Sequence, residues 1–288
     1  MLLTINHTTN YEYDDNLLGL IQTTKLTPSP YNGLKILNWT VKRNNKSGGE
    51  IFRDGEGNNI INFKGEPSEK EIKFVVKGEV ETIDTNGVYE SLNDKIDPYV
   101  YLRSTILTLP NDKIKELASI ASKDSSNEDT VTIAHDLMLL IAKKIKYEPY
   151  TTNTNTTAAM SIDQEKGVCQ DQAHIMISAA RYLGIPSRYV NGYMHKNRND
   201  SEFQATHAWA ELYIDQLGWV GFDPTNQCCP DERYIRVSCG LDASYAAPIR
   251  GIFYGNTAEK LDIDVQTIEN CSQSVSYTHL TLPTIAGV

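Results

Sequence analysis

The chain has 288 residues and a mass of 32.3 kDa, and 40% of its residues are hydrophobic, which is enough to bury the core of one large domain or two small ones. Its formal net charge is −10 and its pI is about 5.1. These values argue against nucleic acid or an anionic membrane as the main partner, because either would require a concentration of Lys and Arg. The five cysteines, few and odd in number, indicate free thiols in a reducing compartment rather than a disulfide scaffold.

The N-terminus becomes polar after its first residues and has no basic start, so no signal peptide is expected. The longest purely apolar run, Leu137 to Ala142, has six residues. A membrane span requires roughly 20. The sequence therefore predicts a soluble, cytoplasmic protein.

Residues 1–95 have the composition of short β-strands. β-Branched and aromatic residues gather in Ile36 to Val41, Asn59 to Phe63 and Ile72 to Val76. Turn clusters separate these runs, most clearly the string DGEGN at residues 54–58. We expect a β-rich N-terminal domain over residues 1–95, followed by a polar connection.

From Asn111 the apolar residues recur at helical spacing. Asn111 is expected to cap a helix ending near Ser122, and Asp129 to cap a second helix ending near Lys146. A third helix is expected to begin at Cys169 and to stop at Gly184. Three strand-like runs follow, at residues 187–193, 205–214 and 219–223. Helices followed by an antiparallel sheet predict an α+β domain over residues 96–269.

The last residues, 270–288, contain no Asp, Glu, Lys or Arg. The string SVSYTHLTLPT resembles translated sequencing-adapter read-through, so we expect this tail to lie outside the native fold.

Cys169 is a candidate nucleophile because it lies at the predicted start of a helix. Unpaired backbone N–H groups and the positive end of the helix dipole favour a thiolate there, and the thiolate is the reactive form. Taken alone, this cysteine could equally well be a buried structural residue.

His207 and Asp223 strengthen the interpretation because the expected hairpin brings them together. If Tyr213 lies opposite Trp219, then Trp209 lies opposite Asp223, and His207 and Asp223 become diagonal neighbours on one face, about 7 to 8 Å apart between backbones. A connection of even length would place them on opposite faces. The three residues supply a nucleophile, a base and an orienting group for covalent acyl transfer.

The strings GVCQDQAH, THAWAELY and FDPT, in the order Cys, His, Asp, resemble the transglutaminase-like superfamily, whose fold is similar to that of papain-type cysteine proteases. RYLGIPSRYVNGY also resembles that family, so the resemblance covers roughly residues 100–255. In the first 85 or so residues, HTTNYEY, LTPSP and DGEGNN are similar to the β-rich N-terminal domain of bacterial members. The resemblance implies that Cys169 is the nucleophile, His207 the general base and acid, and Asp223 the residue that orients the imidazole.

Other titratable residues are interpreted as structural or unassigned. His174 lies about 140° around the helix from Cys169 and is expected to be structural. His7, His135 and His195 have no partner evident in the sequence. Cys228, Cys229 and Cys239 lack the paired spacing of a zinc site, and no EF-hand pattern is present. We therefore expect neither metal nor cofactor.

The Cys169 backbone N–H is the natural candidate for stabilising an oxyanion, with Tyr147 or Gln164 as candidate helpers. The resulting hypothesis is a cysteine protease or amidase that acts on a peptide or protein amide through an acyl-enzyme. The alternatives are amine transfer to protein glutamine, and a non-catalytic binding module of the same fold.

Overall fold

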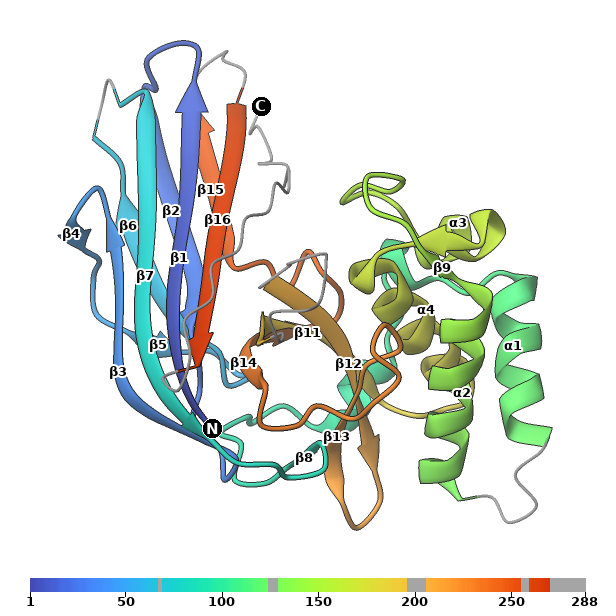
Figure 1. The fold of residues 1–288 in the computed structure, drawn as a ribbon. Helices are drawn as coiled ribbons and strands as arrows, with labels where there is room; N and C mark the ends of the chain where they lie inside the picture. Colours follow the sequence, from blue (N-terminus) through green and yellow to red (C-terminus); the bar gives the residue numbers. More distant parts are fainter. Residues whose placement is uncertain (67–68, 124–128, 196–205, 255–258, 270–288) are drawn as a thin grey trace.

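The computed structural model describes residues 1–66, 69–123, 129–195, 206–254 and 259–269. Figure 1 shows two units side by side. The first is a β-sandwich. The second consists of a layer of helices and a sheet that lies between these helices and the sandwich. The first sheet of the sandwich has the order β16-β1-β7-β3-β4 and the second β15-β2-β6-β5. The sheet that faces the helices has the order β14-β11-β12-β13-β8.

The strands of the sandwich are β1 (Leu2–Tyr13), β2 (Gly19–Thr27), β3 (Leu34–Arg43), β4 (Lys46–Ser47), β5 (Phe52–Arg53), β6 (Asn59–Lys64), β7 (Glu71–Thr82), β15 (Ile249–Tyr254) and β16 (Glu259–Glu269). The expected runs at residues 36–41, 59–63 and 72–76 lie within β3, β6 and β7. Along β1 every second side chain is buried, which is the period of a strand with one face on a core.

The second unit contains β8 (Val88–Tyr89), the 3-10 turns Pro98–Leu102 and Ile106–Thr108, α1 (Asp112–Lys123), α2 (Thr130–Lys144), β9 (Lys146–Tyr147), α3 (Ala158–Gln164), β10 (Lys166–Gly167), α4 (Cys169–Tyr182), β11 (Ser187–Met194), β12 (Thr206–Ile214), β13 (Gly218–Phe222) and β14 (Tyr234–Gly240). The expected caps form. Asn111 accepts a hydrogen bond from the Ile114 backbone N–H at 3.0 Å, and Asp129 accepts one from Val131 at 3.2 Å. The fold class is the α+β class expected from the sequence.

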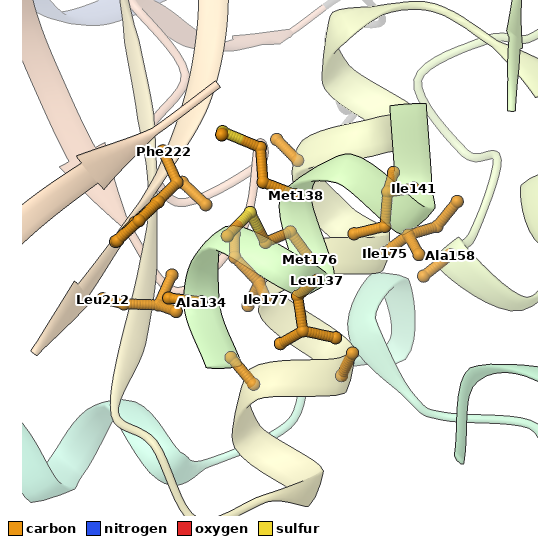
Figure 2. Packing of buried hydrophobic residues seen from close by; sticks show 14 of the residues in the cluster. Ala134, Leu137, Met138, Ile141, Ala158, Ile175, Met176, Ile177, Leu212 and Phe222 are labelled. Atoms are coloured by element: carbon orange, nitrogen blue, oxygen red, sulfur yellow. The ribbon is translucent and has the colours of Figure 1, made fainter. Parts of the chain in front are cut away.

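Helix α4 packs between α2 and the sheet. In Figure 2, Met176 and Ile177 of α4 and Leu137 of α2 lie in one apolar cluster with Leu212 of β12 and Phe222 of β13. Because α4 is buried along most of its length, its first residue is held in a fixed position against the sheet.

The chain returns to the sandwich after β14. Strand β15 pairs with β2 and strand β16 pairs with β1, so residues 249–269 belong to the sandwich sheets. From the sequence alone, these residues are expected to belong to the α+β domain over residues 96–269. Strand pairing between the two ends of a chain follows from tertiary packing, which no local pattern specifies.

The two units share part of a core. Tyr193 of β11 and Ile235 and Val237 of β14 are buried in the same apolar cluster as the sandwich interior. The sandwich therefore packs against one end of the central sheet, and Tyr193 lies on the same face of β11 as Tyr189, which packs against the helices.

None of the described helices is both long and apolar enough to cross a membrane.

Candidate active site

The start of α4 is fixed by a buried carboxylate. Asp171 accepts a hydrogen bond from the Val168 backbone N–H at 2.8 Å, and from the hydroxyls of Thr152 at 2.7 Å and Ser161 at 2.9 Å. This arrangement satisfies the N–H that precedes the helix and ties the loop at Thr152 to it. The N–H groups of Cys169 and Gln170, at the first two helical positions, have no carbonyl partner within the helix.

The hairpin of β12 and β13 has the register that the sequence analysis expected. Tyr213 lies opposite Trp219, and Ala210 lies opposite Phe222. His207 and Asp223 are brought to one face, where His207 Nε2 lies 2.7 Å from Asp223 Oδ2. The expectation that these residues are diagonal neighbours is confirmed.

Cys169 and His207 line the same cavity, and the charge of Cys169 acts on the imidazole. Because Nε2 is paired with Asp223, Nδ1 is the ring nitrogen left to serve Cys169. Burial alone would lower the pKa of His207, but the charges of Asp223 and Cys169, together with the hydrogen bond to Asp223, raise it to about 10. The imidazole is therefore held in its protonated form at neutral pH.

Asp223 is fully buried and held by donors that the sequence analysis did not assign. Its Oδ2 accepts hydrogen bonds from the Tyr234 hydroxyl at 2.7 Å and from the Asn226 side chain at 2.6 Å. Its Oδ1 accepts one from the Thr225 backbone N–H at 2.9 Å. Burial acts to raise the pKa of Asp223, but His207 and these donors hold it below its usual 3.8. The carboxylate remains ionised in a site that excludes water.

Trp209 shields this arrangement. Its ring stacks on that of His207 with centroids 6.3 Å apart, and it meets the Tyr234 ring edge-on at 5.4 Å. Trp209 has no exposed surface, as expected for a core residue. An imidazole enclosed in this way keeps its orientation.

A cavity of about 190 Å³ opens beside Cys169. Part of its lining comes from the helical unit, at the start of α4, on β11 and β12 and in the loop after β14. The rest comes from the sandwich and includes His7, Tyr11, Leu26 and Ile263. The candidate nucleophile and the sandwich therefore face the same space.

The other histidines in the described part of the chain have partners that the sequence did not reveal. His174 is fully buried and accepts a hydrogen bond from the Ala243 backbone N–H at 3.1 Å, so it is structural, as expected. His7 contacts the hydroxyls of Tyr193 and Thr9, each at 2.8 Å. His195 lies 3.7 Å from Glu269, and the His135 ring meets that of Phe222 edge-on.

Tyr147 and Gln164, the candidate helpers for the oxyanion, do not line the cavity that Cys169 lines. Tyr147 of β9 pairs with Gly167, close to the start of α4, and Gln164 ends α3. Neither is among the described residues that line the cavity, whereas Cys169 and Gln170 are. Among the described residues, no group of three His, Cys, Asp or Glu side chains is arranged to hold a metal ion.

Comparisons with known proteins bear on the family and the fold. Residues 118–224 match the transglutaminase-like superfamily, and residues 3–81 match the bacterial transglutaminase-like N-terminal region. An uncharacterized protein of Mycobacterium leprae is 38% identical over 127 residues, which are 43% of this chain and 45% of that protein. The chain spans less than half the length of the relatives of this kind that it matches.

A relative in Pseudomonas aeruginosa, named "Protein-glutamine gamma-glutamyltransferase", is 31% identical over 124 residues, which are 38% of this chain and 18% of that protein. Among solved structures, a "Putative Cysteine Protease" from Cytophaga hutchinsonii has a TM-score of 0.70 at 20% identity and covers 96% of this chain and 94% of its own. That likeness extends over both units and concerns the fold. With its core at residues 118–224 and its N-terminal region at residues 3–81, the chain belongs to the transglutaminase-like superfamily.

Proposed function

We propose that the protein hydrolyses amide bonds of peptides or proteins through an acyl-thioester on Cys169, with His207 as general acid and base and Asp223 as the residue that orients it. The observation that carries the proposal is the 2.7 Å contact of His207 Nε2 with Asp223 Oδ2, in an imidazole that lines the same cavity as Cys169. A nucleophile, a base and a fixed orienting carboxylate are the minimum set for covalent acyl transfer.

In the first half of the proposed reaction, the Cys169 thiolate attacks the amide carbonyl. The oxyanion of the tetrahedral intermediate develops next to the start of α4, where the Cys169 and Gln170 N–H groups can donate to it. His207 then transfers its Nδ1 proton to the departing nitrogen, the C–N bond breaks, and the amine leaves.

In the second half, neutral His207 accepts a proton from water as the water oxygen attacks the thioester. The C–S bond breaks, the carboxylic acid is released, and Cys169 again faces a protonated imidazole. Asp223 keeps the proton on Nε2 throughout, so Nδ1 remains the nitrogen that exchanges protons with substrate.

Amine transfer to protein glutamine is the second candidate, because both reactions share the thioester. It is favoured by the name of the Pseudomonas aeruginosa relative and by the tyrosines that line the cavity, Tyr11, Tyr189 and Tyr193, since aromatic walls help to exclude water. Hydrolysis is favoured by the polar string MHKNRNDSEFQAT at residues 194–206, in which Phe203 is the only aromatic residue. Most of that segment lies outside the described residues.

The test supplies a peptide amide substrate together with a primary amine at millimolar concentration and quantifies both products by mass spectrometry. Hydrolysis predicts mostly free acid. Predominance of the amine adduct at low millimolar amine would establish transfer instead. If neither product forms and an amide-mimic thiol probe fails to modify Cys169, the protein is a binding module of this fold.

A further inference from the structure

The residues that line the cavity beside Cys169 indicate which substrate side chain it accepts. We infer that it selects an uncharged, predominantly apolar substrate side chain next to the scissile amide, and that the β-sandwich, with strands from both ends of the chain, supplies the selecting wall. The inference rests on the proposed function, because it names the substrate class of the same site.

The wall opposite α4 comes from the sandwich and is mostly apolar, with His7 and Thr9 as its polar residues. Tyr11 of β1, Leu26 of β2, Ile249 of β15 and Ile263 of β16 all line the cavity. Tyr11, Leu26 and Ile263 are buried and belong to the core of the sandwich, so the wall is continuous with a packed interior. A substrate side chain that enters the cavity loses water and gains apolar contacts.

The described lining contains no Asp, Glu, Lys or Arg, although the chain as a whole carries 64 such residues. His7 is the one lining group from the sandwich that could carry a charge, and burial lowers its pKa to about 4. Both of its ring nitrogens are already paired, with Tyr193 and Thr9. The other charged group that lines the cavity, the His207 imidazole, is already paired with Asp223. A charged substrate side chain would therefore enter without a free counter-charge, which is strongly unfavourable.

The shape of the cavity also favours a large side chain. Ala243, Ala246 and Ala247, in the loop after β14, line the side of the cavity and leave its volume unfilled. Two hydrogen bonds hold that loop in place. His174 accepts a hydrogen bond from the Ala243 backbone N–H, and the Ser238 hydroxyl donates one to the Ala246 carbonyl at 2.7 Å. A fixed opening of this kind suits an aliphatic or aromatic side chain.

The experiment measures kcat/KM for peptide amides in which the residue on each side of the scissile bond is varied in turn. At one of the two positions, Leu, Phe or Tyr is expected to exceed Lys, Arg, Asp and Glu by on the order of 100-fold. Similar rates for charged and apolar residues at both positions would overturn the inference.

A pair of variants on β15 tests whether the sandwich wall does the selecting. Ile249 lines the cavity, whereas Ile252 lies on the same strand with 56% of its surface exposed and is not among the lining residues. Ile249→Glu is expected to lower kcat/KM for the Leu peptide by roughly 10-fold and to raise it for the Lys peptide by roughly 10-fold, because a carboxylate then faces the substrate. Ile252→Glu is expected to change neither.

The release of p-nitrophenol from p-nitrophenyl acetate separates this inference from the proposed function. The acetyl group makes no demand on the cavity, so a burst in the wild type that Cys169→Ala lacks indicates acyl-enzyme formation. A missing burst overturns the proposed function. A normal burst combined with an unchanged side-chain preference in Ile249→Glu overturns the cavity inference alone.

Discussion

At the scale of single residues, the donors around Asp223 explain how a carboxylate without solvent contact stays ionised. Burying an unpaired carboxylate is costly, but here Oδ2 accepts from His207, Asn226 and Tyr234, and Oδ1 accepts from backbone N–H groups. With its charge preserved, Asp223 fixes the tautomer of His207. Tyr234 and Asn226 therefore act on the reaction through Asp223, as positioning residues.

The Tyr234→Phe variant tests this role. It removes one donor from Asp223 without removing the ring that packs on Trp209, so kcat/KM is expected to fall roughly 10-fold, the value of one hydrogen bond to a charged group. Because fewer donors then hold the carboxylate, its pKa should rise, and the acid limb of the pH profile of kcat/KM should move to higher pH.

Tyr213→Phe is the matched control, since Tyr213 lies on β12 and packs edge-on against Trp219 with ring centroids 5.4 Å apart. It should change neither the rate nor the pH profile. A Tyr234→Phe enzyme with a wild-type acid limb would remove Tyr234 from the positioning set.

The cysteines should differ in reactivity. Burial raises the pKa of Cys229 to about 11 and raises that of Cys228 and Cys239, so little thiolate forms at these positions near neutral pH. Cys169 instead faces a protonated imidazole. Iodoacetamide at pH near 6 is expected to modify Cys169 first, with peptide mapping by mass spectrometry as the readout.

His207→Ala gives the control for this labelling. It removes the positive charge beside Cys169, so the rate of modification at pH near 6 should fall while the other thiols keep their rates. Equal labelling of all cysteines in the wild type would contradict the assignment of Cys169 as the nucleophile.

The candidate triad could be predicted from the sequence, but its supporting residues could not. Cys169 follows from a helix start, and the positions of His207 and Asp223 follow from one hairpin register, both of which are local patterns. Tyr234 reaches Asp223 only because β14 pairs with β11, and His7 reaches the cavity only because the sandwich packs on the central sheet. Such contacts depend on long-range packing that alternation and spacing do not encode.

At the scale of elements, a buried ionic network holds together the strands that carry the site. Glu211 of β12 accepts from Arg188 of β11 and from Arg236 of β14, each at 2.6 Å, and Arg188 also donates to Asp94 at 2.7 Å. Glu211 lies on the same face of β12 as His207. The network therefore fixes β11, β12 and β14 relative to one another next to the site.

Glu211→Gln is expected to destabilise the protein by about 3–5 kcal/mol, because it leaves the buried Arg236 guanidinium without a compensating charge and leaves Arg188 paired with Asp94 alone. Urea unfolding followed by far-UV circular dichroism measures the change. Glu12→Gln serves as the control, since Glu12 pairs with Lys260 at 3.2 Å on the surface and its removal should leave the midpoint unchanged. A midpoint for Glu211→Gln equal to that of Glu12→Gln would show that the network adds no stability.

The same carboxylate gives a pH dependence of stability. Burial acts to raise the pKa of Glu211, but Arg236 and Arg188 hold it below its usual 4.5. A group whose pKa is lower in the folded state contributes stability above its unfolded pKa, and this contribution is lost as the pH falls through the folded value. The wild type should therefore lose stability below about pH 4.5, and Glu211→Gln should lose less over the same range. An identical pH dependence for both proteins in chemical denaturation would contradict this account.

Elements with a strong local signal were predictable and those paired at long range were not. The helices after Asn111, Asp129 and Cys169 have caps or stop signals, and α2 ends within two residues of the position expected. Strand β16 also alternates, with Leu261, Ile263 and Val265 buried. Alternation reveals a strand but not its partner, so the sequence alone does not show that residues 249–269 pair with β1 and β2.

At the scale of the whole molecule, the two ends of the chain close one sandwich and form one wall of the cavity. Strand β1 lies between β16 and β7, with β16 at the edge of the sheet, so the sandwich depends on residues that follow the helical unit. Ile249 and Ile263 of these late strands line the cavity. Folding of the sandwich and formation of the substrate wall are therefore expected to occur together.

A chain ending at Pro248 tests this dependence, because it lacks β15 and β16. The truncation removes Phe253, Leu261, Ile263 and Val265, all buried in the sandwich core. Loss of each large core side chain costs about 2–5 kcal/mol, and their sum reaches the whole stability of a typical domain, about 5–15 kcal/mol. It also leaves β1 and β2 each with an unpaired edge.

We expect the shortened chain to lose cooperative unfolding of the sandwich, to be cleaved rapidly by trypsin within residues 1–82, and to lose acylation at Cys169. A chain ending at Glu269 is the control and is expected to match the 288-residue chain in all three measurements. Cooperative unfolding of the shorter chain with an unchanged midpoint would instead mean that the sandwich is complete without its last two strands.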